Sequence, residues 1–112
     1  MNERPSILFH FAARRDFELA TWRDSYRAPS LDSEGFIHCA TRAQIPGVIE
    51  RHLQGRIDLV RLTLDASRLE TILRYEWSES SQDEYPHVYG PIPMNAVISI
   101  EMFDPTTATY GG

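Results

Sequence analysis

The order of strand-like and helix-like segments is the sequence feature that most limits the fold. Four strand-like segments follow one another in the second half of the chain, at 57–65, 71–77, 87–92 and 96–103. A short helical stretch at 66–70 and a polar loop at 78–84 are the main connections between them. Strands joined by connections this short favour antiparallel pairing, because a parallel pair needs a long crossover. No glycine-rich turn of the kind that binds dinucleotides or phosphates joins a strand to a helix.

The first half of the chain alternates strands with helices. A strand is predicted at 6–12, and a helix over 14–26 follows it. Asp16 favours the start of this helix, and Leu19, Trp22 and Tyr26 are spaced to share one face. This helix would pack on the sheet through that face.

A second strand and a second helix complete the first half. The strand is predicted at 35–40, and Thr41 and Gln44 have the spacing of a capping box at the start of a helix over 42–53. Pro46 is tolerated only in the first turn of that helix. The whole pattern predicts an α+β fold with small, split antiparallel β-sheets, six or more strands in two sheets, and two main helices.

Composition limits the domain count and the partners. The chain has 112 residues and fits one domain over 1–112. Its net charge is −5 and its arginines are interleaved with acids, so a nucleic-acid surface is not expected. No apolar run approaches the roughly 20 residues that cross a bilayer. With one cysteine, Cys39, and no signal-peptide pattern, we expect a cytoplasmic protein.

Three of the four histidines lie in apolar or aromatic strand-like segments: His10, His38 and His87. Alternate residues of a strand share a face, which places Phe36 with His38, and His87 with Tyr89. Imidazoles on a sheet surface can bind a polar ligand or move a proton near neutral pH, and in an open cleft each would titrate near its usual pKa of about 6.5. The alternative is that each histidine is structural and bonds to a backbone carbonyl.

Other chemistries have weaker support. His10, His38, His87, Cys39 and Glu76 could supply metal ligands, but zinc sites usually show a local pair of ligands and none occurs here, so no metal is expected. Cys39 is expected to be a small buried residue. Glu76 lies between two aromatic residues, and its carboxyl group has either a raised pKa or an ion pair with Arg74.

Two motifs resemble a known family. The segment "SLDSEGFIHCA" with Gln44, and the later "LRYEW" and "YPHVYGPI", closely resemble domain-of-unknown-function family number 952. The resemblance runs from "ILFHFA" to "AVISIE". This chain departs from the family at Ala40, where Ser is usual, and at Tyr85, where Phe is common. The family looks like a small relative of the ADP-ribosyltransferase fold, which binds NAD in a cleft between two sheets.

The resemblance implies roles for particular residues. His10, Ser30, His38 and Tyr89 would bind the ligand, and His87 and Glu76 would be catalytic. The ligand would be NAD or a related ribosyl nucleotide, cleaved or transferred at its N-glycosidic bond. "PHVYG" occupies the place of the motif that usually supplies a catalytic Glu. A binding module without catalysis and an interaction protein with structural histidines therefore remain alternatives. No partner protein is implied.

Overall fold

The computed structural model describes residues 4–107 and is an α+β structure, as the segment order predicts. Its strands are β1 (Ile7–Ala13), β2 (Thr21–Trp22), β3 (Ser25–Tyr26), β4 (Ile37–His38), β5 (Leu59–Asp65), β6 (Leu73–Ser78), β7 (Asp83–Val88), β8 (Ile92–Pro93) and β9 (Val97–Phe103). Its helices are α1 (Arg14–Ala20), α2 (Pro29–Ser33) and α3 (Ile45–Val48), and its shorter helical turns are η1 (Arg42–Gln44), η2 (Ile49–Leu53), η3 (Ala66–Arg68) and η4 (Met94–Ala96). None of the described helices is long and apolar enough to cross a membrane.

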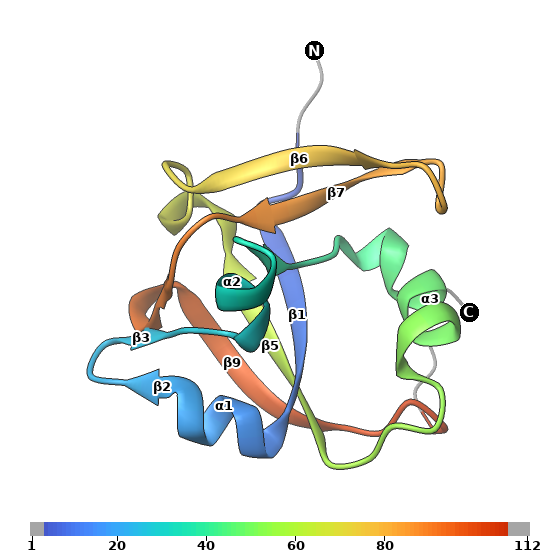
Figure 1. Ribbon diagram of the computed structural model, residues 1–112, viewed down its shortest axis with the longest axis horizontal. Coiled ribbons are helices and arrows are strands. Elements are labelled where there is room, and N and C mark those ends of the chain that lie inside the picture. The colour runs from blue at the N-terminus through green and yellow to red at the C-terminus, as the bar shows by residue number, and fades with distance from the viewer. Residues whose placement is uncertain (1–3, 108–112) are drawn as a thin grey trace.

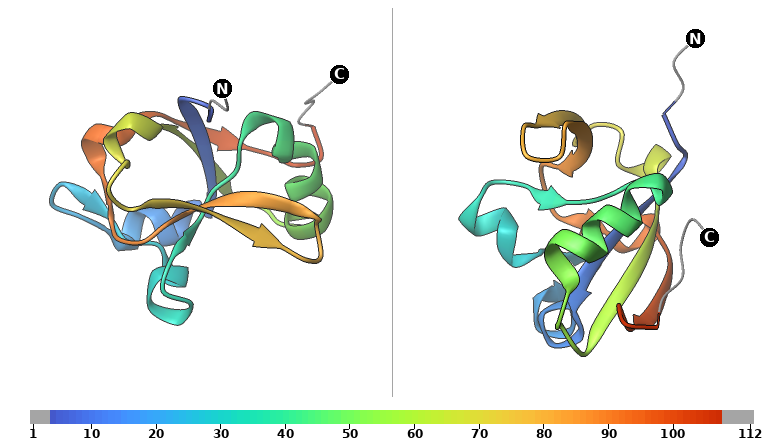
Figure 2. Two further views of the ribbon diagram at one scale, coloured as in Figure 1. Left: turned by 90° about the horizontal axis from the view of Figure 1, so that it is seen from above. Right: turned by 90° about the vertical axis from the view of Figure 1, so that its right-hand side faces the viewer.

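The strands form three small sheets in place of the two expected. Their orders are β1-β5-β9, β2-β3-β8 and β4-β7-β6, and every pair is antiparallel. Figures 1 and 2 show the β6–β7 hairpin crossing above the β1-β5-β9 sheet rather than continuing it. The two sheets are therefore separate walls, with α2 and α3 at the open side between them.

The first helix is shorter than predicted. It ends at Ala20, and residues 21–26 form the β2–β3 hairpin, so the prediction of a helix as far as Tyr26 is wrong. Tyr26 pairs with Ile92 of β8 and is buried, whereas Leu19 and Trp22 are exposed. Phe17 is the residue of α1 that packs inward. The pairing with a distant strand overrides the local helical spacing.

The second helical segment matches its predicted extent of 42–53. The capping box forms: the Thr41 side chain accepts from the backbone of Gln44, and the Gln44 side chain accepts from Thr41 N at 3.0 Å. Pro46 lies in the first turn of α3. The segment is irregular, because the 3-10 turn η1, the short α3 and the π-type turn η2 follow one another.

Two later boundaries also differ from the prediction. Only residues 79–82 form the turn of the hairpin, since Asp83 already begins β7. The predicted strand at 87–92 is broken at Gly90, so that Val88 ends β7 and Ile92 begins β8 in another sheet. Pro91 lies in the break and has no backbone N–H to donate to a continuous ladder.

One core joins the three sheets. From the β1-β5-β9 sheet, here called the long sheet, it contains Leu8, Leu62 and Leu64. The β2-β3-β8 sheet contributes Tyr26 and Ile92, and the β4-β7-β6 sheet contributes Ile37 and Val88. A smaller cluster, with Leu53, Leu59 and Phe103, packs between the η2 turn and the other face of the long sheet. These two cores hold the hairpin, the helical segment and the long sheet around a cavity.

Candidate functional site

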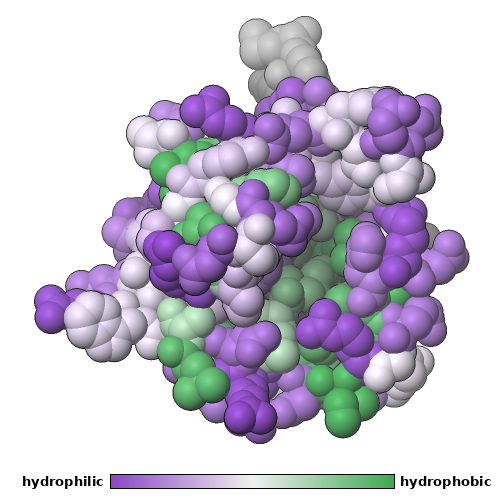
Figure 3. Space-filling model, viewed as in Figure 1, coloured by the Kyte–Doolittle hydropathy of each residue, from purple (hydrophilic) through white to green (hydrophobic). Residues whose placement is uncertain are grey.

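All four histidines of the chain line one cavity of about 710 Å³. Its walls come from β1, the segment from Tyr26 to Ser30, β4, the helical segment 48–56 and the β6–β7 hairpin. Figure 3 looks into this hollow and shows a hydrophobic floor inside a largely hydrophilic rim. His10, His38 and His87 therefore surround one space, and His52 joins them from the helical segment.

His10 is the buried member of the group. Its Nδ1 lies 2.6 Å from the carbonyl oxygen of His38, and its Nε2 lies 3.2 Å from the Tyr26 hydroxyl. A carbonyl only accepts, so Nδ1 carries the proton and Nε2 accepts from the Tyr26 O–H. Burial lowers the pKa of His10 to about 4. The expectation that His10 titrates near 6.5 is wrong, because its ring is shielded from water and occupied at both nitrogens.

His87 forms a hydrogen-bonded chain with Glu76 and Tyr89. Its Nδ1 lies 2.6 Å from Glu76 Oε1, and the Tyr89 hydroxyl donates to the same oxygen at 2.6 Å. His87 reaches the cavity, whereas Glu76 and Tyr89 stand behind it and do not line the cavity. We call the first two of these residues, His87 and Glu76, the His87–Glu76 pair.

The electrostatics of the His87–Glu76 pair follow from these bonds. The hydrogen bond from Tyr89, and then that from His87, lower the pKa of Glu76. The hydrogen bond between Tyr89 and Glu76 raises the pKa of Tyr89. The expectation of a raised pKa for Glu76 is wrong, because hydrogen-bond donors surround its carboxylate more closely than apolar rings do. Glu76 is therefore an anion at neutral pH, placed to orient the imidazole of His87.

A second imidazole with a carboxylate partner faces the first. His38 Nε2 lies 3.1 Å from Glu34 Oε1, four residues earlier in the chain. His38 is paired with His87 across β4 and β7, and their ring centroids are 5.5 Å apart. Phe36 stacks on His87 at 4.0 Å and packs on His38 at 4.8 Å. One phenyl ring thus holds both imidazoles in place.

Ser30 and Ala40 line the cavity beside these rings. The Ser30 hydroxyl donates to the backbone oxygen of Phe36 at 2.8 Å and so ties α2 to the residue before β4. Ala40, where the resembled family usually has Ser, is buried and bridges to Phe9 of β1. Cys39 is buried, and burial raises the pKa of its thiol to about 12, which makes it a poor nucleophile.

The sequence interpretation missed several residues of the site. Glu34 carried a usable signal, since its spacing from His38 allows the pair that forms. Tyr26 carried no such signal, because the spacing placed it in a helix that ends at Ala20 in the structure. Phe36 was placed on the face of His38 but given no role. Among the described residues, no group of three or more His, Cys, Asp or Glu is placed to hold a metal ion.

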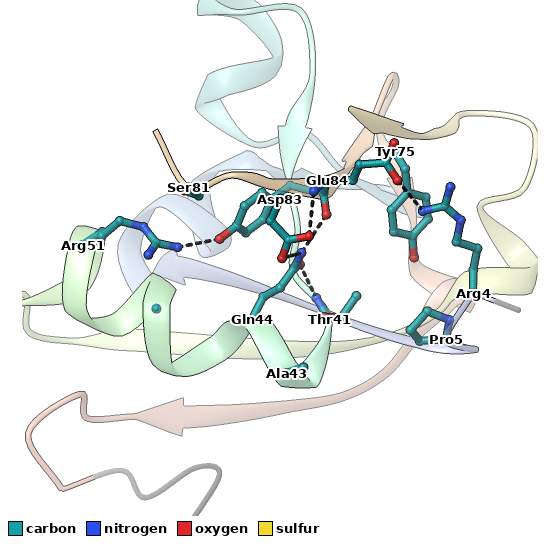
Figure 4. A pocket seen from close by; sticks show the side chains of 12 residues that line it. Arg4, Pro5, Thr41, Ala43, Gln44, Arg51, Tyr75, Ser81, Asp83 and Glu84 are labelled. Atoms are coloured by element: carbon teal, nitrogen blue, oxygen red, sulfur yellow. Dashed lines mark hydrogen bonds and ion pairs between the residues drawn. The ribbon is translucent and has the colours of Figure 1, made fainter. Parts of the chain in front are cut away.

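A smaller pocket of about 440 Å³ lies beside the turn end of the hairpin (Figure 4). The buried Gln44 reaches from η1 to the hairpin and donates to Asp83 Oδ2 at 3.0 Å and to the Glu84 carbonyl at 2.7 Å. At the two ends, Arg51 donates to the Tyr85 hydroxyl and Arg4 pairs with Glu84. These polar groups are paired with one another, so the pocket fastens the hairpin to the helical segment.

The fold and the site define a small α+β protein in which three antiparallel sheets enclose a histidine-lined cavity. The chain belongs to the family described as "Protein of unknown function (DUF952)", whose profile matches residues 11–100. The membership inferred from the two motifs is confirmed. No curated protein sequence gives a significant match.

Solved structures from Caulobacter crescentus share the fold. The crystal structure of protein CC0527 has a TM-score of 0.78 and 22% sequence identity, and the match covers 88% of this chain and 86% of that one. The solution NMR structure of CC0527 has a TM-score of 0.74 and 22% identity, with 89% and 86% covered. At this identity the likeness concerns the fold.

Proposed function

We propose that this protein binds NAD or a related ribosyl nucleotide in the histidine-lined cavity and cleaves its N-glycosidic bond, as a glycohydrolase or an ADP-ribosyl transferase. The choice of NAD rests on the resemblance of the motifs to the ADP-ribosyltransferase-like fold. The observation that carries the catalytic part is the His87–Glu76 pair, with His87 at the cavity wall. A cavity of about 710 Å³ is in the range of small-molecule sites.

The proposed reaction breaks the bond between C1′ of the ribose and the nicotinamide nitrogen. The bonding electrons leave with nicotinamide, which becomes neutral, and C1′ acquires oxocarbenium character. The oxygen of a water or of an acceptor hydroxyl adds to C1′, and its proton passes to Nε2 of His87. Glu76 holds the opposite ring nitrogen and stabilises the imidazolium, so it is a positioning residue.

The remaining groups would bind and orient the nucleotide. His38 and Ser30 line the cavity beside His87, and Tyr89 supports Glu76 from behind. His10, with both nitrogens occupied by the protein, shapes the wall through its contact with the His38 carbonyl. A ribose hydroxyl would bond to its ring only by replacing the Tyr26 hydroxyl.

One observation favours a second candidate, a binding module without catalysis. Glu76 accepts two hydrogen bonds and does not line the cavity. The carboxylates that line it are Asp16 and Glu34, and Glu34 is paired with His38. Neither Glu76, which lies outside the cavity, nor Glu34, which His38 engages, is therefore free to stabilise the C1′ cation.

Release of nicotinamide from NAD separates the two candidates. An enzyme releases nicotinamide, measured by chromatography, and His87→Ala lowers kcat by roughly 100-fold because a general base is lost. Glu76→Gln should lower kcat with little change in KM and alter the pH profile, while Glu70→Gln, an exposed carboxylate outside the cavity, should change neither. NAD binding without nicotinamide release leaves the binding module; an active His87→Ala variant contradicts the assigned role.

A further inference from the structure

We propose that the outer part of the cavity is a nucleoside-phosphate subsite in which Trp77 stacks on the base and Arg56 binds the phosphate. This inference rests on the proposed function and specifies which part of the ligand lies where. Trp77 enters the cavity from β6, and Arg56 from the segment after η2. In Figure 1 the β6–β7 hairpin lies at the top and α3 lies at the right.

Trp77 is an exposed aromatic ring that is hydrogen-bonded within its own hairpin. The residue is 55% exposed although it lines the cavity. Its indole N–H donates to Glu79 Oε2 at 2.6 Å, within the same hairpin. A ring that is already oriented loses little conformational entropy when a base stacks on it. Stacking on an aromatic side chain is the general way in which proteins bind unpaired bases.

Arg56 supplies a positive charge on the other side of the opening. Among residues 4–107, no side-chain hydrogen bond, ion pair or ring contact is recorded for its guanidinium, whereas Arg14 and Arg27 are paired with aspartates. Its backbone N–H bonds to the Leu53 carbonyl at 3.1 Å, which fixes the base of the side chain. An arginine that lines a cavity without a carboxylate partner is suited to a phosphate, which its planar guanidinium can bind with two N–H groups.

The distribution of charge in the cavity agrees with this orientation. The two carboxylates of the lining, Asp16 and Glu34, come from α1 and from the turn after α2. In Figure 1, α1 and α2 lie to the left of α3. A phosphate is therefore repelled from the side that carries Asp16 and Glu34, and the ribose hydroxyls can donate to those carboxylates. The reactive end then lies near His38 and His87.

Tryptophan emission tests the base contact directly. The chain has two tryptophans, and Trp22 lies on β2 outside the cavity, so a Trp22→Phe variant reports on Trp77 alone. We expect AMP and adenosine to quench this emission and ribose 5-phosphate to leave it unchanged. Trp77→Ala should weaken AMP binding, measured by calorimetry, at least about fivefold. AMP binding that neither alters the emission nor weakens in Trp77→Ala overturns the base contact.

The phosphate contact is tested by comparing AMP with adenosine. Arg56→Gln should weaken AMP about tenfold at low salt and leave adenosine unchanged, because only AMP carries the phosphate. Arg68→Gln, an exposed arginine outside the cavity, is the matched control and should change neither affinity. An equal loss for both ligands, or no AMP binding at millimolar concentration, overturns the subsite.

These results are separable from those on the proposed reaction. AMP binding at Trp77 and Arg56 without nicotinamide release supports the subsite and contradicts catalysis. Nicotinamide release with an unchanged KM for NAD in Trp77→Ala supports the reaction and contradicts the subsite.

Discussion

At the residue scale, burial changes the acid–base chemistry of His10 in a range of pH that is easily reached. Burial lowers its pKa from 6.5 to about 4, so the folded protein holds the neutral ring at pH 7. The unfolded chain binds a proton between these two values and the folded chain does not, so acidification favours unfolding. The contribution of His10 to the unfolding free energy is complete above about pH 6.5 and is lost as the pH falls to about 4.

Acid unfolding is therefore predicted to involve His10. The shift corresponds to a loss on the order of 3 kcal/mol between pH 6.5 and pH 4. Urea melts across this range should show the decline, and His10→Gln should flatten it because the amide does not titrate. If that variant does not fold, the ring proton resonances of the parent give the answer. A His10 resonance that titrates near pH 6.5 in the folded protein would falsify this account.

At the scale of elements, one amide side chain ties the β6–β7 hairpin to the start of the helical segment. Gln44 connects η1 to both Asp83 and the Glu84 carbonyl, and its own oxygen caps Thr41. Removing these three part-buried bonds costs about 1–3 kcal/mol in total. The hairpin carries Trp77 and His87, so its attachment also determines the shape of the cavity.

Gln44→Ala is therefore predicted to lower the unfolding free energy by about 1–3 kcal/mol and to speed amide exchange in β6 and β7. Gln44→Glu should be at least as damaging, since it loses both donors and places a second carboxylate beside Asp83. Gln54→Ala, an exposed glutamine, is the control and should leave stability and exchange unchanged. Unchanged hairpin exchange in Gln44→Ala would show that other contacts hold the hairpin.

Elements specified by local signals could be predicted from the sequence, and elements specified by distant contacts could not. The β5 strand and the Thr41–Gln44 capping box depend on neighbouring residues and were predicted. The end of α1 depends on Tyr26 pairing with Ile92, which is distant in sequence. Alternation placed His38 and His87 on definite strand faces, but it did not indicate that Tyr26 would hold His10 or that Phe36 would pack on both imidazoles.

At the scale of the whole molecule, the three sheets are one packing unit. Leu62 of the central strand β5 is fully buried in the core shared by all three sheets. The short β2-β3-β8 and β4-β7-β6 sheets have little hydrophobic surface of their own to bury, and small sheets of this kind need packing against other elements to be stable. The sheets should therefore unfold together rather than one by one.

The two tryptophans make this cooperativity measurable, because Trp22 lies in the β2-β3-β8 sheet and Trp77 in the β4-β7-β6 sheet. Trp22→Phe and Trp77→Phe each leave one reporter, and both change exposed residues, so the parent stability should be kept. Denaturant melts of the two variants should give the same midpoint. Adding Leu62→Ala to each should lower the free energy of unfolding of both by the same amount, about 2–5 kcal/mol. Separate midpoints, or a Leu62→Ala effect confined to one reporter, would mean that the sheets unfold independently and that the shared core does not couple them.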